Sequence, residues 1–235
     1  MADAVPYIFN PGIRFPAYLI RKGLLQHISS NAPYLKGRMM DFGCGSKPYR
    51  SLFNVEEYIG VDYNGEGHSH EKEQIDVLYD GHHIPFPDQY FDSVFTSEVF
   101  EHIFNLEEII PEINRVMRTG AVMLITCPFA IAEHEQPADF ARYSSFGLQH
   151  LLKKNGFKIV NFEKIGSSFE TIMQLKMMYY HMHVMPKFNK LIIVKPVVEF
   201  LLYPVLNIYT KIMNRILPRR YDLYMNNLVV CEKIS

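Results

Sequence analysis

The sequence lacks several features that mark common functional classes. Its 235 residues include only three cysteines, Cys44, Cys127 and Cys231, and these lie far apart. Such spacing forms neither a zinc motif nor a disulfide framework, and it favours a reducing compartment. The 24 lysines and arginines do not outnumber the 25 aspartates and glutamates. Because broad nucleic-acid surfaces need a basic excess, we expect no nucleic-acid partner.

Long apolar runs are also missing. The first ten residues, MADAVPYIFN, have neither the basic nor the apolar region of a signal peptide. A membrane span needs roughly 18 uninterrupted apolar residues, and no window reaches that length. The nearest approach, residues 191–217, is broken by Lys195, Pro196, Glu199 and Lys211. We therefore expect a cytoplasmic chain, with any membrane contact limited to the membrane surface.

The composition predicts one folded unit. Hydrophobic residues make up 48% of the chain, which is enough for a large core, and charged residues make up 21%. Strand-like and helix-like segments alternate along it, and this order is typical of an α/β fold with a parallel sheet. We expect a single Rossmann-like domain over residues 1–235. Its mostly parallel, seven-stranded sheet should have helices on both faces and an antiparallel last strand.

The segment boundaries follow from turn and cap signals. Helices are predicted over residues 17–30, 105–120 and 144–156, the second closed by Gly120 and the third by Gly156, since glycine often ends a helix. The predicted strands cover residues 38–42, 57–63, 75–80, 91–98, 121–129, 157–166 and 223–234.

Polar residues follow the ends of four predicted strands. They are Asp41, Asp62, Asp80 and the pair Ser97 and Glu98. Ligands of parallel sheets bind outside the carboxyl ends of the strands. Any one of these residues alone is equally well explained as a turn or cap residue, but four in succession predict a site at this edge.

The stretch MMDFGCGSKPY supplies a glycine turn that stops early. Gly43 and Gly45 allow close approach of a ligand because they have no Cβ atom. A dinucleotide site places a third glycine ahead of a helix that holds a pyrophosphate, whereas this chain has Pro48. The turn therefore favours a ligand with a ribose and no pyrophosphate, with Asp62 accepting hydrogen bonds from the ribose hydroxyls.

These motifs together resemble the class I S-adenosylmethionine-dependent methyltransferases, in particular their type-11 domain. DFGCGSKPY is similar to the family's glycine motif, with Lys47 in place of its last glycine, and VDYN is similar to its acidic motif. DGHHIPFPDQYFDSVFTSEVFEHI resembles its long signature. The resemblance extends from about Arg38 to Gly166.

The resemblance implies S-adenosyl-L-methionine as the cofactor and assigns its contacts. The amino-acid part of the cofactor would lie over the glycine turn, the ribose at the second acidic strand end, the adenine at the third and the sulfonium near the fourth. The implied cofactor-binding residues are Asp41, Gly43, Cys44, Gly45, Asp62, Tyr63, Asp80, Gly81, Ser97 and Glu98.

A polar stretch after the predicted fifth strand, AEHEQPADFARYSS, is the candidate acceptor site. We predict His134 as a general base, since histidine is the commonest one, with Asp139 or Glu135 orienting it. Arg142 would grip an anionic group of the acceptor. His102, at the end of EVFEH, is a second candidate base. The alternatives are a capping and salt-bridge cluster for the stretch and a packing role for His102.

The stretch also resembles a motif of methyltransferases that accompany cell-surface polysaccharide and lipopolysaccharide biosynthesis. The resemblance implies a small-molecule, glycan or lipid-linked acceptor, and it leaves the methylated atom open. The remaining paired histidines have no cysteine nearby and few acids around them, and we expect no bound metal. These pairs are His68 and His70, His82 and His83, and His181 and His183.

Residues 168–220 form an apolar, net-basic insert before the last strand. Eight lysines and arginines stand against two glutamates in it. We expect helices that act as a lid, as a homodimer face, or as a surface for a membrane or lipid-linked acceptor.

Three function hypotheses remain open. The first is a methyltransferase, and the second is a module of the same fold that binds the cofactor without catalysis. The third, a nicotinamide oxidoreductase, is disfavoured by the missing third glycine. The effect of each cofactor on the unfolding temperature would discriminate them.

Overall fold

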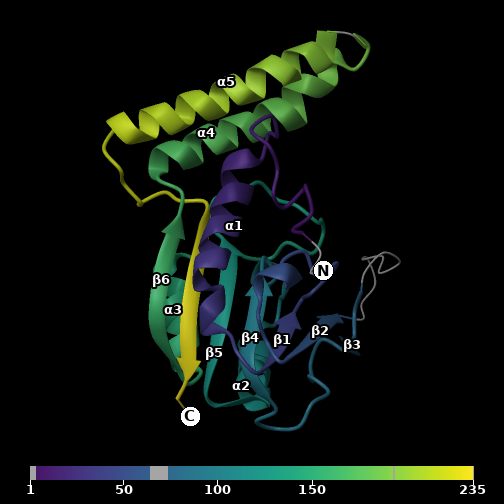
Figure 1. The fold of residues 1–235 in the computed structure, drawn as a ribbon, viewed down its shortest axis with the longest axis vertical. Coiled ribbons are helices and arrows are strands. Elements are labelled where there is room, and N and C mark those ends of the chain that lie inside the picture. The colour runs from purple at the N-terminus through teal and green to yellow at the C-terminus, as the bar shows by residue number, and fades with distance from the viewer. Residues whose placement is uncertain (1–3, 64–73, 193, 235) are drawn as a thin grey trace.

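The computed structural model describes residues 4–63, 74–192 and 194–234. Among these residues, seven strands form one sheet in the order β3-β2-β1-β4-β5-β7-β6 (Figure 1). The strands are β1 (Arg38–Phe42), β2 (Glu57–Tyr63), β3 (Val77–Tyr79), β4 (Phe91–Ser97), β5 (Met117–Pro128), β6 (Phe157–Ile165) and β7 (Asn226–Lys233). β1 to β5 run parallel, while β7 lies antiparallel to both β5 and β6. The predicted fold class is confirmed.

Helices cover both faces of this sheet. The α-helices are α1 (Tyr18–Asn31), α2 (Leu106–Val116), α3 (Ser145–Lys154), α4 (Ser168–Tyr179) and α5 (Val194–Ile216). Short helical turns are η1 (Ala32–Tyr34), η2 (Arg50–Leu52), η3 (Phe100–His102), η4 (Tyr180–Val184) and η5 (Met185–Phe188). α1 packs on one face, and α2 and α3 pack on the other (Figure 1).

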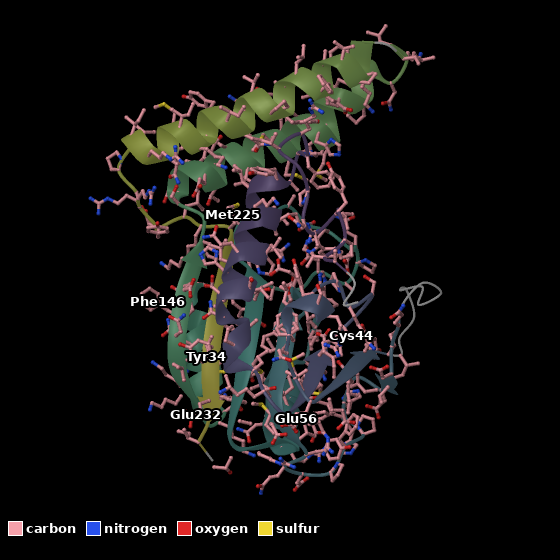
Figure 2. The ribbon with its side chains drawn as sticks, viewed as in Figure 1. Tyr34, Cys44, Glu56, Phe146, Met225 and Glu232 are labelled. Carbon is pink, nitrogen blue, oxygen red and sulfur yellow. The ribbon has the colours of Figure 1, made fainter. Side chains whose placement is uncertain are left out.

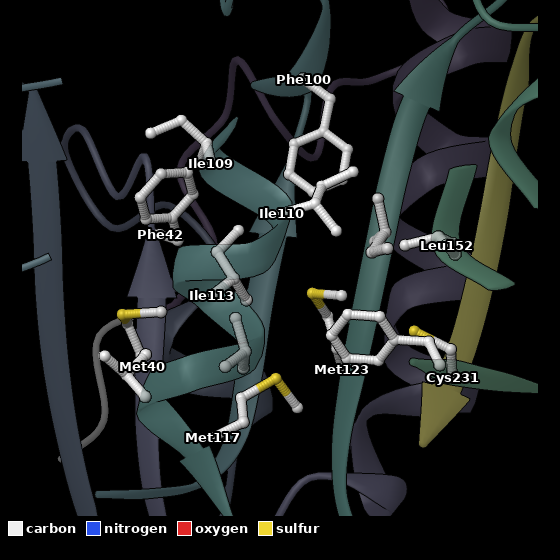
Figure 3. Packing of buried hydrophobic residues seen from close by; sticks show 14 of the residues in the cluster. Met40, Phe42, Phe100, Ile109, Ile110, Ile113, Met117, Met123, Leu152 and Cys231 are labelled. Carbon is white, nitrogen blue, oxygen red and sulfur yellow. The ribbon is translucent and has the colours of Figure 1, made fainter. Parts of the chain in front are cut away.

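The alternation of side chains along β1 separates two cores. Successive strand residues point to opposite faces. Met39 and Met40 are both fully buried, yet Met39 packs with the α1 cluster and Met40 with the cluster under α2 and α3. In α2, the isoleucines at 109, 110 and 113 recur at helical spacing and pack over Phe42 (Figure 3). A strand buried on both faces explains why RMMDF is nearly all apolar.

The prediction that Gly120 ends the helix after β4 is wrong. α2 ends at Val116, and β5 begins at Met117, which is already extended, fully buried and paired with Phe91. The strand register shifts beyond this pair, and Gly120 lies in the shifted stretch with φ 82°. A positive φ inside an irregular strand is the second common reason for a glycine, so the cap signal was ambiguous.

The insert forms an arm of two helices at one end of the molecule (Figure 1). α4 begins with a full capping box, in which the Ser167 hydroxyl and the Glu170 carboxylate each accept from the other's backbone N–H. On α5, Asn207 donates to the Ile13 and Phe15 carbonyls at 2.8 and 3.3 Å. The arm is therefore fixed to the segment ahead of α1. Within the described part of the chain, no helix has the length and apolar character of a membrane span.

Candidate functional site

The glycine turn after β1 is held by β2. The backbone N–H groups of Gly43 and Cys44 both donate to the Val61 carbonyl, at 2.8 and 3.2 Å. Gly43 has φ 72°, and a Cβ atom there would lie 2.3 Å from the Val99 side chain. Only glycine fits this position. The Cys44 side chain is buried close to Gly60 (Figure 2), so only its backbone is left to face a ligand.

Lys47, which stands where the family has its last glycine, keeps a glycine-like backbone. Its φ is 53°, a left-handed conformation that costs a non-glycine residue free energy. Its ammonium group binds the Asp76 carboxylate at 2.5 Å, and the same oxygen accepts from the Gly60 N–H at 2.6 Å. This ion pair offsets the strain, and the turn keeps its shape without the third glycine.

Asp62 lies at the carboxyl end of β2 and connects it to the turn. Its Oδ2 accepts from the Gly45 N–H at 2.7 Å, and its Oδ1 accepts from the Tyr63 N–H at 2.8 Å. A carboxylate has about four lone-pair positions, so each oxygen can accept one more donor. The group is part-exposed, and it fits the two hydroxyls of a ribose.

Asp41 is fully enclosed below the turn. Burial raises the pKa of its carboxyl group to about 7, against the opposing effect of the hydrogen bond from the Tyr58 hydroxyl. The Asp41 carboxyl is thus held by Tyr58 of β2, and its predicted roles in ordering the turn and in contacting the ligand both stay predictions.

Asp80 and Gly81, which follow β3, lie beside Tyr63. The ring of Tyr63 is half-exposed and packs near Tyr79. A Cβ atom at Gly81, which has φ 87°, would lie 2.7 Å from that ring. The Asp80 carboxylate accepts from the His82 and His83 N–H groups at 2.8 and 2.7 Å, which lowers its pKa. An exposed aromatic face beside a fixed carboxylate fits a flat heterocycle with an amino group.

Glu98 follows β4 and has an unusual backbone conformation. With Glu101 and the loop after β5, it forms the second half of the sheet edge. Its φ is 57°, and its Oε2 accepts from the Asn226 amide at 2.6 Å, whereas Oε1 is enclosed with no hydrogen-bond partner in the described chain. Burial raises the pKa of Glu98 to about 7, opposed most by the nearby Thr126 hydroxyl and then by the charge of Arg21. Neighbouring Ser97 bonds to Thr126 at 2.8 Å. An enclosed, unpaired carboxyl oxygen fits a cationic group of a ligand.

The stretch after β5 and the turn η3 interlock. Phe140 and Ala141 both donate backbone N–H groups to the Glu101 carbonyl, at 2.8 and 3.2 Å. The His102 Nδ1 lies 2.6 Å from the Ala138 carbonyl. The rings of His102 and His134 meet edge to face with centroids 4.8 Å apart. The two candidate bases, far apart in sequence, therefore share one small cluster.

Asp139 orients His134, and it also binds Arg142. Its Oδ2 accepts from the His134 N–H at 2.9 Å and lies 3.4 Å from the His134 Nδ1. Both terminal nitrogens of Arg142 donate to this carboxylate, one at 2.6 Å, and the pair lowers the pKa of Asp139 to about 2. The guanidinium fork that was predicted to grip an acceptor is thus engaged within the chain. Glu135 lies at the rim of the cluster, with its Oε2 3.8 Å from the His102 Nε2.

Three residues of the site were missed in the sequence. Glu101 is fully buried in the cluster, Asn226 binds Glu98, and the charge of Arg21 from α1 acts on Glu98. Glu101 stood beside His102 in EVFEH, and a charged residue inside an apolar turn was the available signal. Asn226 and Arg21 come from β7 and α1, and no local pattern connects them to this edge. His68 and His70 lie outside the described residues.

Part of the chain is similar in sequence to known proteins. Residues 40–125 match the sequence pattern of a methyltransferase domain. An uncharacterised protein of Methanocaldococcus jannaschii is 31% identical over 109 residues, which are 46% of this chain and 51% of that one. The sterol 24-C-methyltransferase erg6 of Schizosaccharomyces pombe is 28% identical over 141 residues, covering 51% and 37% of the two chains. The chain thus spans about half or less of the length of these relatives.

Solved structures share the fold at low sequence identity. The [4+2]-cyclase SpnF is 17% identical with a TM-score of 0.57, over 93% of this chain and 84% of its own. A SAM-dependent methyltransferase of Archaeoglobus fulgidus is 19% identical with a TM-score of 0.55, over 97% and 99%. These likenesses show the fold, a Rossmann-like α/β domain of the kind found in methyltransferases. Since one of the two structures is described as a cyclase, the reaction depends on the residues at the site.

Proposed function

We propose that this chain, which carries a methyltransferase domain over residues 40–125, moves a methyl group from S-adenosyl-L-methionine to an acceptor bound beside the loop after β5. The observation that carries the proposal is Asp62, which ends β2 and accepts the Gly45 N–H at 2.7 Å. One carboxylate thereby fixes the glycine turn and presents spare acceptor positions to a ribose. The cofactor supplies an electrophilic methyl group on a positively charged sulfur.

The chain's own residues would align the reaction. Methyl transfer is an in-line displacement, and the protein supplies mainly proximity and orientation. The enclosed oxygen of Glu98 suits the positive end of the cofactor. His134 would accept the acceptor proton through Nε2, while Asp139 holds its Nδ1 side. As the acceptor atom bonds to the methyl carbon, the sulfur–methyl bond breaks and its electron pair stays on sulfur.

The alternative is a cofactor-binding module without catalysis. Unfolding temperatures measured with S-adenosylhomocysteine and NAD test the cofactor, because a ligand of the native state raises stability. A rise with S-adenosylhomocysteine alone supports the proposal, and a rise with NAD alone overturns it. Labelled methyl transfer, screened over sugars and lipid-linked sugars, tests catalysis. A chain that binds S-adenosylhomocysteine and methylates none of these acceptors favours the non-catalytic module.

The acceptor class is proposed from two features. The stretch from His134 to Tyr143 resembles the motif of methyltransferases in cell-surface polysaccharide biosynthesis, which favours a glycan-type acceptor. The relative from S. pombe is named for a sterol, which is a lipid. The α4–α5 arm adds a surface suited to lipid, and together these features favour a lipid-linked glycan in cytoplasm-facing membrane.

The outer face of α5 is an unpartnered apolar stripe. Side chains at helical spacing are 47–61% exposed along it, namely Val197, Leu201, Val205, Ile208 and Ile212. The opposite face carries Tyr203, Asn207 and Thr210, which are buried against the rest of the molecule. An apolar stripe that faces outward along a whole helix calls for a partner.

We propose that this stripe binds an anionic lipid surface, because the arm is net basic. Residues 168–220 carry eight basic and two acidic side chains. Repulsion between two copies disfavours a dimer through this face, whereas anionic headgroups attract it. With no helix of the described chain able to span a membrane, the arm would lie in the plane of the interface.

Flotation with liposomes tests this surface. Wild-type protein should float with anionic vesicles, less with neutral ones, and Val205→Glu with Ile208→Glu should abolish flotation. Phe146→Glu is the matched control, because Phe146 is 81% exposed on α3, away from the arm (Figure 2). A wild type that stays in the soluble fraction and runs as a dimer in light scattering would replace the lipid by a second copy. A soluble monomer would leave a lid over the site.

A further inference from the structure

Glu101 poses a problem that the methyltransferase assignment leaves unsolved. Its side chain is 0% exposed, and neither carboxylate oxygen has a hydrogen-bond partner in the described chain. Buried polar groups nearly always have partners, and an unpaired carboxylate in an apolar interior is costly. Two imidazole nitrogens lie within 4 Å of it, the Nε2 atoms of His102 and His134, at 3.7 and 4.0 Å from Oε1.

The opposite nitrogens of both rings face acceptors. The His102 Nδ1 lies 2.6 Å from the Ala138 carbonyl, which can only accept, so Nδ1 carries the proton. The His134 Nδ1 lies 3.3 Å from the Ala132 carbonyl and 3.4 Å from Asp139 Oδ2. His102 thus directs an unprotonated Nε2 toward Glu101. His134 does the same when its Nδ1 donates to one of these two oxygens, and the donor-only Nη2 of Arg142 also lies 3.5 Å from that Nδ1. Metal-binding histidines usually have this arrangement, in which the ring nitrogen away from the metal donates its N–H to a carbonyl or carboxylate.

The spacing of these three atoms suits one small cation. The ligand atoms of Glu101, His102 and His134 all lie within 4.8 Å of one another. A point equidistant from atoms so spaced is about 2.5 Å from each, against roughly 2.1 Å in zinc sites. Movements of a few tenths of an ångström would close the site. Two imidazoles and one carboxylate favour a transition ion such as zinc over magnesium or calcium, which prefer oxygen ligands.

We propose that Glu101, His102 and His134 bind one divalent transition-metal ion of the zinc class. Three protein ligands leave a position open, as catalytic zinc sites do. Glu135, whose Oε2 is 3.8 Å from the His102 Nε2, lies at the rim beside it. The expectation of no bound metal rested on the other histidine pairs, and these three ligands come together only in the folded chain.

The role of the ion rests on the proposed methyl transfer. An acceptor hydroxyl that binds the open position loses its proton to water, because a bound cation lowers the pKa of such a group. Its oxygen then bonds to the methyl carbon and the sulfur–methyl bond breaks. His134 would serve as a ligand in this scheme, and the ion would replace it as the means of activating the acceptor.

Metal binding is measured on the full chain after treatment with a chelator and desalting. Calorimetric titration with zinc chloride should show one site per chain, and Glu101→Gln or His134→Asn should weaken it by about 100-fold or more. His83→Asn is the matched control, since its Nδ1 lies 3.1 Å from the Glu112 carboxylate outside the cluster. Its affinity should equal that of the wild type.

Two measurements separate the possible failures. Wild-type protein that takes up no zinc, or Glu101→Gln that binds it as tightly, overturns the metal site. If a variant does not fold, cobalt added to the wild type decides, because a nitrogen-and-oxygen site of low coordination gives visible absorption and its absence overturns the proposal. S-adenosylhomocysteine titration with chelator present tests the cofactor site separately. If S-adenosylhomocysteine still binds and zinc does not, the metal site is overturned and the proposed cofactor site stands.

Discussion

The two halves of the sheet edge differ in how their acidic side chains are hydrogen-bonded. Around Asp62 and Asp80, carboxylates are satisfied by backbone N–H groups of adjacent turns. Around Glu98 and Glu101, one carboxyl oxygen of the first and both of the second are enclosed without a hydrogen-bond partner in the described chain, and burial raises the pKa of both groups. The first half thus pairs its carboxylates within the fold, whereas the second half keeps buried carboxyl oxygens that could receive a ligand.

The two halves differ in part in the origin of their residues, since Glu98 and Glu101 also lie within the matched range. The first half lies within residues 40–125, where the methyltransferase domain matches, and is built from strand ends in register. The second half adds His134, Asp139 and Arg142 from beyond that range. A shared cofactor and a chain-specific acceptor would divide the edge in this way, because loops change more readily than strand register does.

The largest effect should come from His134. His134→Asn should lower turnover by roughly 100- to 10,000-fold, whether the ring is a base or a ligand. Affinity for S-adenosylhomocysteine should change little, because the cofactor half stays intact. Both are measured on the same preparation, by labelled methyl transfer and calorimetry. Full turnover in a folded variant would remove the loop from the mechanism.

Asp41 is the exception within the cofactor half, because it is buried with a raised pKa. The native carboxyl holds its proton up to pH about 7, whereas the unfolded chain loses it near pH 4. The native state therefore binds more protons between these values, and stability falls as pH rises through this window, by up to roughly 4 kcal/mol. Urea unfolding from pH 4 to 8 should show this slope in the wild type and a flatter one in Asp41→Asn. Parallel curves would contradict the raised pKa.

Asp62→Ala tests the ribose contact in the first half. Loss of hydrogen bonds to a ligand costs about 1–3 kcal/mol, or roughly 5- to 150-fold in affinity for S-adenosylhomocysteine. Part of this loss would come from the freed Gly45 N–H, so Asp62→Asn, which keeps an acceptor oxygen, should lose less. Asp88→Ala changes an exposed acid away from this edge and serves as the control. Unchanged calorimetric affinity in folded Asp62→Ala would end the assignment.

The smallest effect should come from Arg142→Lys, which separates support from substrate binding. Lysine keeps the charge but cannot bind Asp139 with two parallel hydrogen bonds. Because this pair is intramolecular, we expect a loss of about 1–2 kcal/mol of stability in urea unfolding. The acceptor KM should rise only as far as His134 is misplaced. A large rise in the acceptor KM at unchanged stability would instead support the prediction that Arg142 binds the acceptor directly.

The strands were predictable from the sequence because their burial produces local patterns. RMMDF and EYIGVDY were placed to the residue. RMMDF is almost wholly buried, and EYIGVDY is rich in residues that favour strands. The cap at Gly120 failed because a positive φ suits both a helix end and an irregular strand. Glu101 and Asn226 were missed because their meaning depends on β4, β5 and β7 coming together. The site's second half is therefore a product of tertiary structure.

The segment ahead of α1 holds the arm, and α1 itself brings a positive charge near the cofactor edge. Asn207 and Gln174 of the arm hold the carbonyls of Ile13 and Pro16, at 2.8 and 2.9 Å. A few residues on, Arg21 of α1 faces Glu98 at the cofactor edge. If binding at one end alters affinity at the other through this connection, the effect must be equal in the opposite direction, since coupling free energies are reciprocal. A surface that attracts the arm would then tune cofactor occupancy, and the cofactor would tune residence on that surface.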